Sequence, residues 1–303
     1  MKVLREVAAR GSFSAAAEAL SFTQSAVSQQ VAALEKEAGA KLVERGARGI
    51  RLTEAGEALV SHADAILSRI DDAEQELAAI AGLKGGRLRL ACFQSAGATL
   101  VPRAVAEFSK RHPKVELGLR QAEPEEAHEA MCAGDIDLAL IYDFPDNPVP
   151  FSDLEVVPLL DDAYDMVLRE DHRHAKRRRV SLADFKDDTW INSTPGCGCH
   201  HLMMGACRRE GFDPHVSIET DDNEAVQAFV AAGAGIGLLP KLALTTVRPG
   251  LVARDLGPNA PERRILAATL ADGYRSPATE AMIEILCTVA SEFEARRPLA
   301  AAS

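Results

Sequence analysis

Long apolar runs, cysteine and aromatic residues are all scarce in this 303-residue chain. No stretch of about 18 apolar residues occurs, which excludes an ordinary transmembrane helix. The N-terminus, MKVLREVAARGSF, is charged and lacks the apolar core of a signal peptide, so we expect a cytoplasmic protein. Six cysteines are too few for a disulfide scaffold in a chain of this length, and the cytoplasm would keep them reduced. A composition of 47% hydrophobic and 26% charged residues is typical of a globular protein with two or three domains.

Basic residues are also fewer than acidic ones: the chain has 34 Lys and Arg against 45 Asp and Glu, and a formal net charge of −11. Taken alone, this balance argues against nucleic acid, because Lys and Arg that neutralise phosphates supply most non-specific binding. The first 60 residues nevertheless hold eight Lys or Arg and seven Asp or Glu, so the acidic excess lies downstream. Their late cations can present a locally positive edge to a duplex: Lys36, Lys41, Arg45, Arg48 and Arg51.

The N-terminal segment predicts three short helices, over residues 2–10, over residues 14–20 and from Gln24 onward. Thr23 is a good N-cap for the third helix, because its hydroxyl oxygen can accept a hydrogen bond from an unpaired backbone N–H. A tight turn near residues 20–23 joins the second and third helices. This is the geometry of a helix-turn-helix, whose second helix enters the major groove of DNA.

The stretch ALSFTQSAVSQQVAALE contains the predicted third helix. Helical spacing places Val27, Val31 and Leu34 on one apolar stripe. The opposite face carries small and polar groups that can donate and accept hydrogen bonds: Gln24, Ser25, Ser28, Gln29, Ala32 and Lys36. One face therefore belongs to a core and the other is available to DNA.

The segment AKLVERGARGIRLTEAG follows and predicts a strand, a glycine-containing turn and a return strand ending at Leu52. Arg45, Arg48 and Arg51 make it a basic wing. The alternative is an ordinary three-helix packing unit with solvated arginines.

The signals S-F-x-x-A-A-x-x-L and T-Q-S-A-x-S-x-Q occur in register in the first 60 residues, followed by V-A-A-L-E, which matches the third signal, L-x-x-L-E, except for valine at its first position. This segment resembles the winged helix-turn-helix of LysR-type transcriptional regulators. Family members usually begin several residues earlier, so we expect a short first helix. The resemblance implies base-reading positions at Gln24, Ser25, Ser28 and Gln29, backbone contacts from Thr23 and Lys36, and wing contacts from Arg48 or Arg51.

Residues 54–82 predict a linker helix that is capped by Thr53 and carries a coiled-coil seam. Apolar residues recur in it at alternating spacings of four and three, which is typical of helices that pair. The alternative is an amphipathic helix that lies on its own domain. The resembled family pairs through such a helix, so we interpret the seam as a dimerisation surface: Leu59, Ala63, Ile66, Ile70, Ala73, Leu77 and Ile80.

Beyond the Gly-rich boundary GLKGGRLRL, strands and helices alternate in a pattern that favours a parallel α/β fold. The expected strands are at 87–93, 114–120, 136–142, 188–192, 215–220 and 235–239, and the helices at 100–111, 124–133, 197–210, 222–232 and 277–295. Residues 86–303 resemble the two-lobed, periplasmic-binding-protein-like effector domain of the same family. The resemblance implies a first lobe of about 86–161 and 268–303 and a second lobe of about 162–267, after a DNA-binding domain over 1–53.

A ligand is expected between the lobes, because open parallel sheets bind ligands beyond the carboxyl ends of their strands. The turns CFQSAGATL and INSTPGCGCHH each place hydroxyl groups ahead of a helix, and helix N-termini favour anions. We therefore expect a small anionic effector, although these residues could equally be simple N-caps. The candidate contacts are Gln94 and the residues that the family resemblance favours: Ser95, Gln121, Tyr142, Thr194, Asn223 and Gly235.

The cluster CGCHHLMMGAC offers an alternative, a thiol-based redox or metal-responsive regulator using Cys197, Cys199 and Cys207. If residues 197–210 are helical, Cys199 and Cys207 lie about two turns, roughly 12 Å, apart, which is too far for a disulfide without unwinding. Most unpaired cysteines are structural, so small buried or capping residues are the preferred interpretation. The basic run HRHAKRRR is interpreted as a solvated turn before a Ser181 cap, not as a second nucleic-acid patch.

Enzymes and transport proteins are the remaining classes. No G-x-S-x-G, G-x-x-x-x-G-K or H-E-x-x-H motif occurs, and a solute-capturing transport protein would carry a signal peptide and no helix-turn-helix. We therefore expect a dimeric or tetrameric regulator of transcription, with operator DNA and a small effector as partners and no catalytic site, cofactor, metal or membrane contact.

Overall fold

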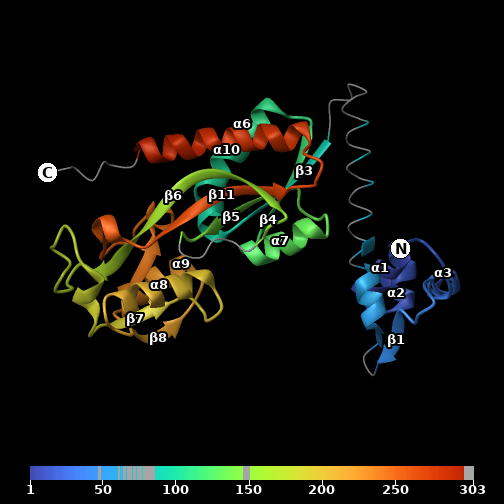
Figure 1. Cartoon of the computed structure of the whole chain (residues 1–303), viewed down its shortest axis with the longest axis horizontal. Coiled ribbons are helices and arrows are strands. Elements are labelled where there is room, and N and C mark those ends of the chain that lie inside the picture. Colours follow the sequence, from blue (N-terminus) through green and yellow to red (C-terminus); the bar gives the residue numbers. More distant parts are fainter. Residues whose placement is uncertain are drawn as a thin grey trace. The chain divides into compact units, whose positions relative to one another are not determined.

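The computed structural model describes residues 1–46, 49–60, 62–63, 66, 70, 73, 77, 86–145 and 151–296. The chain divides into two units, one of Met1–Leu83 with Glu129–Asp135 and one of Lys84–His128 with Ile136–Ser303 (Figure 1). Within the described ranges, no helix has both the length and the apolar character that a membrane span requires.

The first unit begins with three helices and a two-stranded hairpin: α1 (Lys2–Arg10), α2 (Phe13–Ala19), α3 (Gln24–Ala38), β1 (Val43–Gly46) and β2 (Gly49–Leu52). Ser12 caps α2 by accepting a hydrogen bond from the Ala15 N–H, so this helix begins one residue before the predicted start. The helices enclose a small core, whose buried side chains are Val3, Leu4, Val7, Ala16, Ala17, Val27, Val31 and Leu42.

The linker after the hairpin is helical over residues 54–60, and the described residues at 62, 63, 66, 70, 73 and 77 are helical as well. Thr53 begins this helix by accepting a hydrogen bond from the Gly56 N–H, as the sequence predicts.

The second unit alternates strands and helices and ends in a long helix. In chain order its elements are β3 (Gly86–Cys92), α5 (Gln94–Ala98), α6 (Leu100–Arg111), β4 (Val115–Gln121), α7 (Pro124–Cys132), β5 (Leu138–Asp143), β6 (Leu154–Arg169), η1 (Leu182–Phe185), β7 (Thr189–Asn192), α8 (Gly198–Arg209), β8 (His215–Glu219), α9 (Asn223–Ala231), β9 (Ile236–Pro240), η2 (Lys241–Leu244), β10 (Leu251–Asp255), η3 (Gly257–Asn259), β11 (Glu262–Leu270) and α10 (Pro277–Arg296). The predicted strands and helices are all present, with bounds that differ by one or two residues.

The strands join into one mixed sheet in the order β4-β3-β5-β11-β6-β9-β7-β8, with β10 beside β6. The first lobe contains β3, β4, β5 and β11 with α6, α10 and the part of α7 before Glu129. The second lobe contains β7, β8, β9 and β10 with α8 and α9. Parallel pairing holds within β4-β3-β5 and within β9-β7-β8, whereas β11 and β6 run antiparallel to their neighbours.

Strand β6 connects the lobes and, like β10 and β11, is absent from the strands that the sequence predicted. It pairs with β11 from Leu154 to Ala163 and then with β9 and β10 from Tyr164 to Arg169. Its sequence contains Pro158 and three aspartates, which argue against a central strand. The structure accommodates the proline beside a register shift in the β6–β11 ladder.

Each lobe has its own apolar core. In the first lobe, α6 and α10 lie together over the strands and contribute side chains such as Phe108 and Met282 (Figure 1). In the second lobe, Trp190 and Phe185 are fully buried among residues of β6, α8 and β9. The β11 strand pairs with β5 from Arg264 onward, so the chain returns to the first lobe earlier than the predicted boundary at 268.

Candidate functional sites

Helix α3 presents the polar face that the sequence predicted. The Thr23 hydroxyl oxygen accepts a hydrogen bond from the Ala26 N–H at 3.2 Å, and Ser21, with φ of 57°, makes the turn that leads into the helix. Val27 and Val31 are buried, and Leu34 packs against the same core. All six residues expected on the opposite face are exposed: Gln24, Ser25, Ser28, Gln29, Ala32 and Lys36.

The wing is held against the helices through backbone contacts. The Ile50 N–H donates to the Gly11 carbonyl at 2.8 Å, and a Cβ on Gly49 would lie 2.7 Å from the same oxygen. Only glycine therefore allows this approach. Arg51 is exposed on β2, whereas Arg48 and the side chain of Arg45 lie outside the described residues.

Glu35, the acidic residue of the V-A-A-L-E segment, has a structural role. Its carboxylate accepts hydrogen bonds from the Lys41 ammonium at 2.7 Å and from the backbone N–H groups of Leu42 and Val43. The hydrogen bond from Lys41, followed by those from the backbone, lowers the pKa of Glu35. This carboxylate ties the end of α3 to the start of the wing, and it engages one of the cations expected at the positive edge.

The predicted dimerisation seam divides into two parts. Leu59 packs against the core of the first unit and Ala63 is buried, so the start of this stripe is used within its own chain. Ile66, Ile70 and Leu77 are between 46% and 65% exposed, although all three are large and apolar. Ala73 is exposed too, and Ile80 lies outside the described residues.

A cavity of about 130 Å³ lies between the two lobes of the second unit. Its lining comes from the turns that follow β3, β7 and β8, from the ends of β5 and β9, and from the middle of β6 and the start of β11. The carboxyl ends of parallel strands thus surround it, which is where an α/β sheet binds ligands.

Four of the seven predicted effector residues line this cavity: Gln94, Ser95, Tyr142 and Asn223. The Gln94 side chain bridges the lobes, because its amide N–H donates to Asp222 at 2.8 Å and its carbonyl oxygen accepts from the backbone and side-chain N–H groups of Asn223.

The other three predicted effector residues are not among the lining residues. Thr194 bonds to Asp221 through both its hydroxyl and its backbone N–H. Gln121 is exposed at the end of β4, and Gly235 packs on the Thr189 carbonyl, which a Cβ would approach to 2.7 Å. The glycine serves close packing of strands, not the cavity.

Among the described residues that line the cavity, Arg263 is the one cationic side chain, and the sequence did not predict it there. It is 3% exposed and donates two hydrogen bonds to the buried Asp162, at 3.0 and 3.1 Å, and one to the Ser95 hydroxyl at 2.6 Å. Its guanidinium carbon lies 4.8 Å from the Phe93 ring centroid and 4.9 Å from that of Tyr142. The alternation of side chains along β11 places residue 263 on the inward face. This alternation is the sequence signal that could have identified Arg263.

Carboxylates occupy another part of the lining. Glu123 accepts a hydrogen bond from the Tyr142 hydroxyl at 2.8 Å, and burial raises the pKa of Glu123, with Asp221 and Glu125 adding to the rise. The Glu123 carboxylate would repel an anion. An anionic group in this cavity would therefore have to lie near Arg263, which is itself already paired with Asp162, and away from Glu123.

Cys197 and Cys199 also line the cavity, but Cys207 does not. Cys207 is fully buried in the core of the second lobe, and burial raises its pKa to about 12. The three cysteines of the expected thiol cluster therefore divide into a pair at the cavity and a separate core residue.

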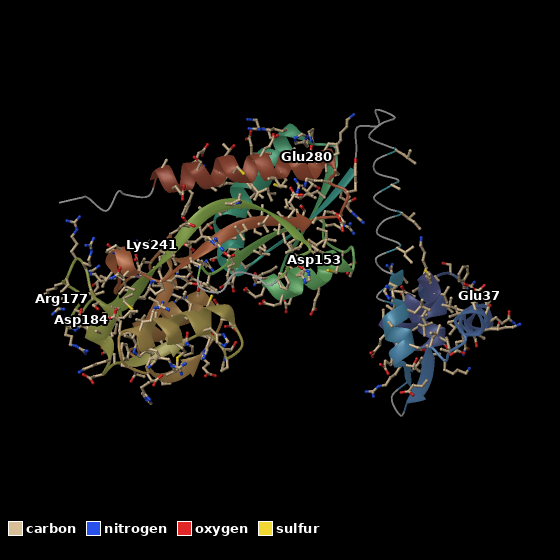
Figure 2. The ribbon with its side chains drawn as sticks, viewed as in Figure 1. Glu37, Asp153, Arg177, Asp184, Lys241 and Glu280 are labelled. Carbon is tan, nitrogen blue, oxygen red and sulfur yellow. The ribbon has the colours of Figure 1, made fainter. Side chains whose placement is uncertain are left out.

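The basic run at 172–179 forms ion pairs within the second lobe. Arg173 pairs with Asp188 at 2.6 Å, and Arg177 pairs with Asp184 at 3.0 Å. Arg177 and Asp184 are both labelled in Figure 2. Ser181 caps the short helix η1, as predicted. These pairs agree with a solvated turn, not with a surface that binds nucleic acid.

Comparisons with known proteins agree with this geometry. Residues 1–57 match the family described as bacterial regulatory helix-turn-helix protein, lysR family, and residues 81–290 match the LysR substrate binding domain. The chain is 32% identical to the HTH-type transcriptional regulator CbbR of Rhodospirillum rubrum over 94% of each chain.

Solved structures share the fold. Full-length OxyR C199D from Pseudomonas aeruginosa aligns with a TM-score of 0.73 and 22% identity over 95% of this chain and 92% of that one. The regulatory domain of CcmR from Synechocystis PCC6803, solved in complex with 2-PG, aligns with a TM-score of 0.61 and 28% identity over 68% of this chain and 97% of that one. By its family matches and its relatives, this chain belongs to the LysR family of transcriptional regulators.

Proposed function

We propose that this regulator reads its operator with the exposed face of α3 and changes its DNA binding when a small molecule occupies the cavity between the lobes. The observation that supports the first part is the exposed polar face of α3 opposite a buried Val27–Val31 stripe. Gln29 and Ser28 would contact base edges, while Arg51 would contact phosphate or the minor groove. Thr23, Gln24, Ser25, Lys36 and Arg48 complete the proposed surface.

The observation that supports the second part is the position of the Gln94 bridge. This side chain lines the cavity and bonds across it to Asp222 and Asn223 at the start of α9. A ligand that contacts or displaces the bridge would alter how the lobes close. The CcmR regulatory domain, solved with 2-PG, supports a small effector here. An anionic group would lie beside Arg263 and the start of α8.

Assembly is proposed to use the exposed part of the linker stripe, at Ile66, Ile70 and Leu77. These side chains are large, apolar and at least 46% exposed, which favours burial against another chain. A homodimer or homotetramer would then present two copies of α3 to a repeated or palindromic site.

We place the protein in the cytoplasm, where its DNA would be, and assign it no catalytic role, since its relatives are transcriptional regulators. A periplasmic solute-binding role is not favoured for a chain with a helix-turn-helix. The three-cysteine sensor is not favoured either, because Cys207 is buried away from Cys197 and Cys199.

Selection of binding sites from a library of random duplexes tests the proposed DNA contacts. Full-length protein should enrich one short sequence, and Gln29→Ala should relax it, because a well-placed side chain discriminates by about 1–3 kcal/mol per base pair. Arg51→Ala should instead weaken binding to all duplexes and reduce the dependence on salt. Exposed Glu37, at the far end of α3, provides the control variant Glu37→Ala, which should retain the selected sequence. An unchanged sequence and affinity for Gln29→Ala would show that α3 is not the reading helix.

A further inference from the structure

Two cysteines at the start of α8 bring their sulfur atoms to the cavity wall. Cys197 is the N-cap residue and Cys199 lies in the first turn, with Gly198 between them. A Cβ on Gly198 would lie 2.6 Å from a ring carbon of Phe144, so glycine allows the helix to begin this close to the first lobe. The C-G-C sequence therefore places both thiols beside the space available to a ligand.

Two tyrosine hydroxyls and a cation lie near the Cys199 sulfur. The Tyr164 hydroxyl lies 3.3 Å from Sγ, and the Tyr142 hydroxyl oxygen, which donates its hydrogen to Glu123, lies 3.8 Å from Sγ. Arg263 shares this wall. The hydrogen bond from Cys197, together with Arg263 and the tyrosine hydroxyls, lowers the pKa of Cys199 to about 6, against the effect of burial. The pKa of Cys197 is raised, first by its hydrogen bond with Cys199, so Cys199 ionises and Cys197 keeps its proton.

The chain provides its own comparison for this thiol. Burial raises the pKa of Cys92 to about 11 and that of Cys207 to about 12, and it also raises the pKa of Cys287. Among these thiols, Cys199 is the one that is a thiolate at neutral pH and also lines a cavity. A thiolate is the nucleophilic form of cysteine, and a helix N-terminus stabilises it further.

We propose that Cys199 captures small α,β-unsaturated carbonyl compounds covalently inside this cavity. The Cys199 thiolate forms a carbon–sulfur bond at the β-carbon, and the electron pair of the carbon–carbon double bond moves through the carbonyl group to give an enolate. A proton from solvent then returns to the α-carbon, so the addition needs no oxidant or reductant. The Arg263 guanidinium, whose charge is balanced by Asp162, lies in the same wall as a hydrogen-bond donor for the enolate oxygen.

The shape and composition of the cavity fit this class of ligand. About 130 Å³ admits only a small molecule, and the aromatic rings of Phe93, Tyr142 and Tyr164 provide flat apolar walls for a conjugated carbonyl. This proposal deepens the proposed function, since it gives a ligand class to the same cavity. The capture itself can be measured without DNA.

The test is alkylation of the full-length protein by methyl vinyl ketone, followed by peptide mass mapping across a range of pH. The Cys199 adduct should form with a rate that is half-maximal near pH 6 and level above about pH 7, as its lowered pKa requires. A thiol of ordinary pKa gains about tenfold per pH unit over the same range. The exposed Cys132 gives an internal reference in each digest.

At pH 7, lowering a thiol pKa from 9 to 6 raises the thiolate fraction about 90-fold and reduces intrinsic nucleophilicity roughly 20-fold, a net gain of about fourfold. Cys197→Ala removes the strongest hydrogen bond to the thiolate and should move the midpoint of the Cys199 profile to higher pH. Cys199→Ala should abolish the cavity adduct and leave the Cys132 adduct unchanged. In urea, all six cysteines of the wild type should react at similar rates.

Absence of a Cys199 adduct from folded wild-type protein, or a Cys199 rate that still rises tenfold per unit above pH 7, would overturn the proposal. Binding to the selected duplex separates this failure from that of the proposed function. If the unmodified protein selects no duplex sequence, the proposed DNA-reading role of α3 is wrong, whatever the result at Cys199. Protein that selects a sequence and forms no Cys199 adduct contradicts covalent capture alone.

Discussion

The buried pair of Arg263 and Asp162 should respond to mutation as one unit. Asp162 is fully buried and Arg263 is 3% exposed, and two hydrogen bonds join them where β6 and β11 pass between the lobes. The second carboxylate oxygen of Asp162 accepts from the Leu242 N–H at 2.9 Å, and Arg263 also donates to Ser95. Both ions are therefore almost completely removed from the protein surface.

The size of the effect follows from these contacts. Asp162→Asn keeps the shape and the acceptor for Leu242 but leaves the guanidinium charge buried without a counter-charge, which costs about 3–5 kcal/mol of the free energy of unfolding. Arg263→Met leaves the carboxylate in the same position, at a similar cost. The double variant buries no net charge and mainly loses the hydrogen bond to Ser95, which costs about 1–3 kcal/mol. The double variant should therefore be more stable than either single variant.

Urea unfolding followed by tryptophan fluorescence measures these differences. Trp190 is the single tryptophan of the chain and is fully buried in the second lobe, so its transition reports this unit. Arg103→Met is the matched control, because Arg103 pairs with Glu292 at a half-exposed site and should cost no more than about 1 kcal/mol. Single-variant losses that simply add in the double variant would refute the argument that the pair is stabilised by mutual neutralisation.

Two further predictions concern the first unit. A Cβ on Gly56 would lie 2.0 Å from the Leu42 carbonyl oxygen. In a thermal unfolding assay, Gly56→Ala should therefore lower the stability of the DNA-binding unit by about 3 kcal/mol or more. Glu57→Ala, at the next and exposed position, should have little effect in that assay. Ile66→Asp combined with Ile70→Asp should reduce the oligomer to monomers in analytical ultracentrifugation and lower affinity for the selected duplex, because paired helices cannot bury unpaired carboxylates. A double variant that sediments like the wild type would rule out this part of the linker as the association surface.

The sequence by itself determined the local elements of this protein. Thr23 caps α3, and the spacing of Val27 and Val31 sets which face of that helix is buried, because both effects depend on residues within two turns of each other. Most strands and helices of the second unit, though not β6, β10 or β11, were predictable for the same reason, since turn residues and apolar runs lie next to the elements they bound. Four of the predicted effector residues reached the cavity because each ends or follows a strand.

The chemistry of the cavity was decided only by the tertiary structure. Arg263 meets Asp162 and Ser95 across 101 and 168 positions of the chain, and no local pattern links residues so far apart. Thr194 looked like a ligand contact beside its helix, but Asp221, brought there by β8, already occupies its hydroxyl and its backbone N–H. Strand β6 forms despite Pro158 because β11 pairs with it through an irregular ladder. Charge, protonation and hydrogen-bond partners depend on which groups surround an atom in three dimensions. The pKa of Cys199 is lowered first by the neighbouring Cys197, and then by Arg263 and the tyrosines that only the fold brings beside it.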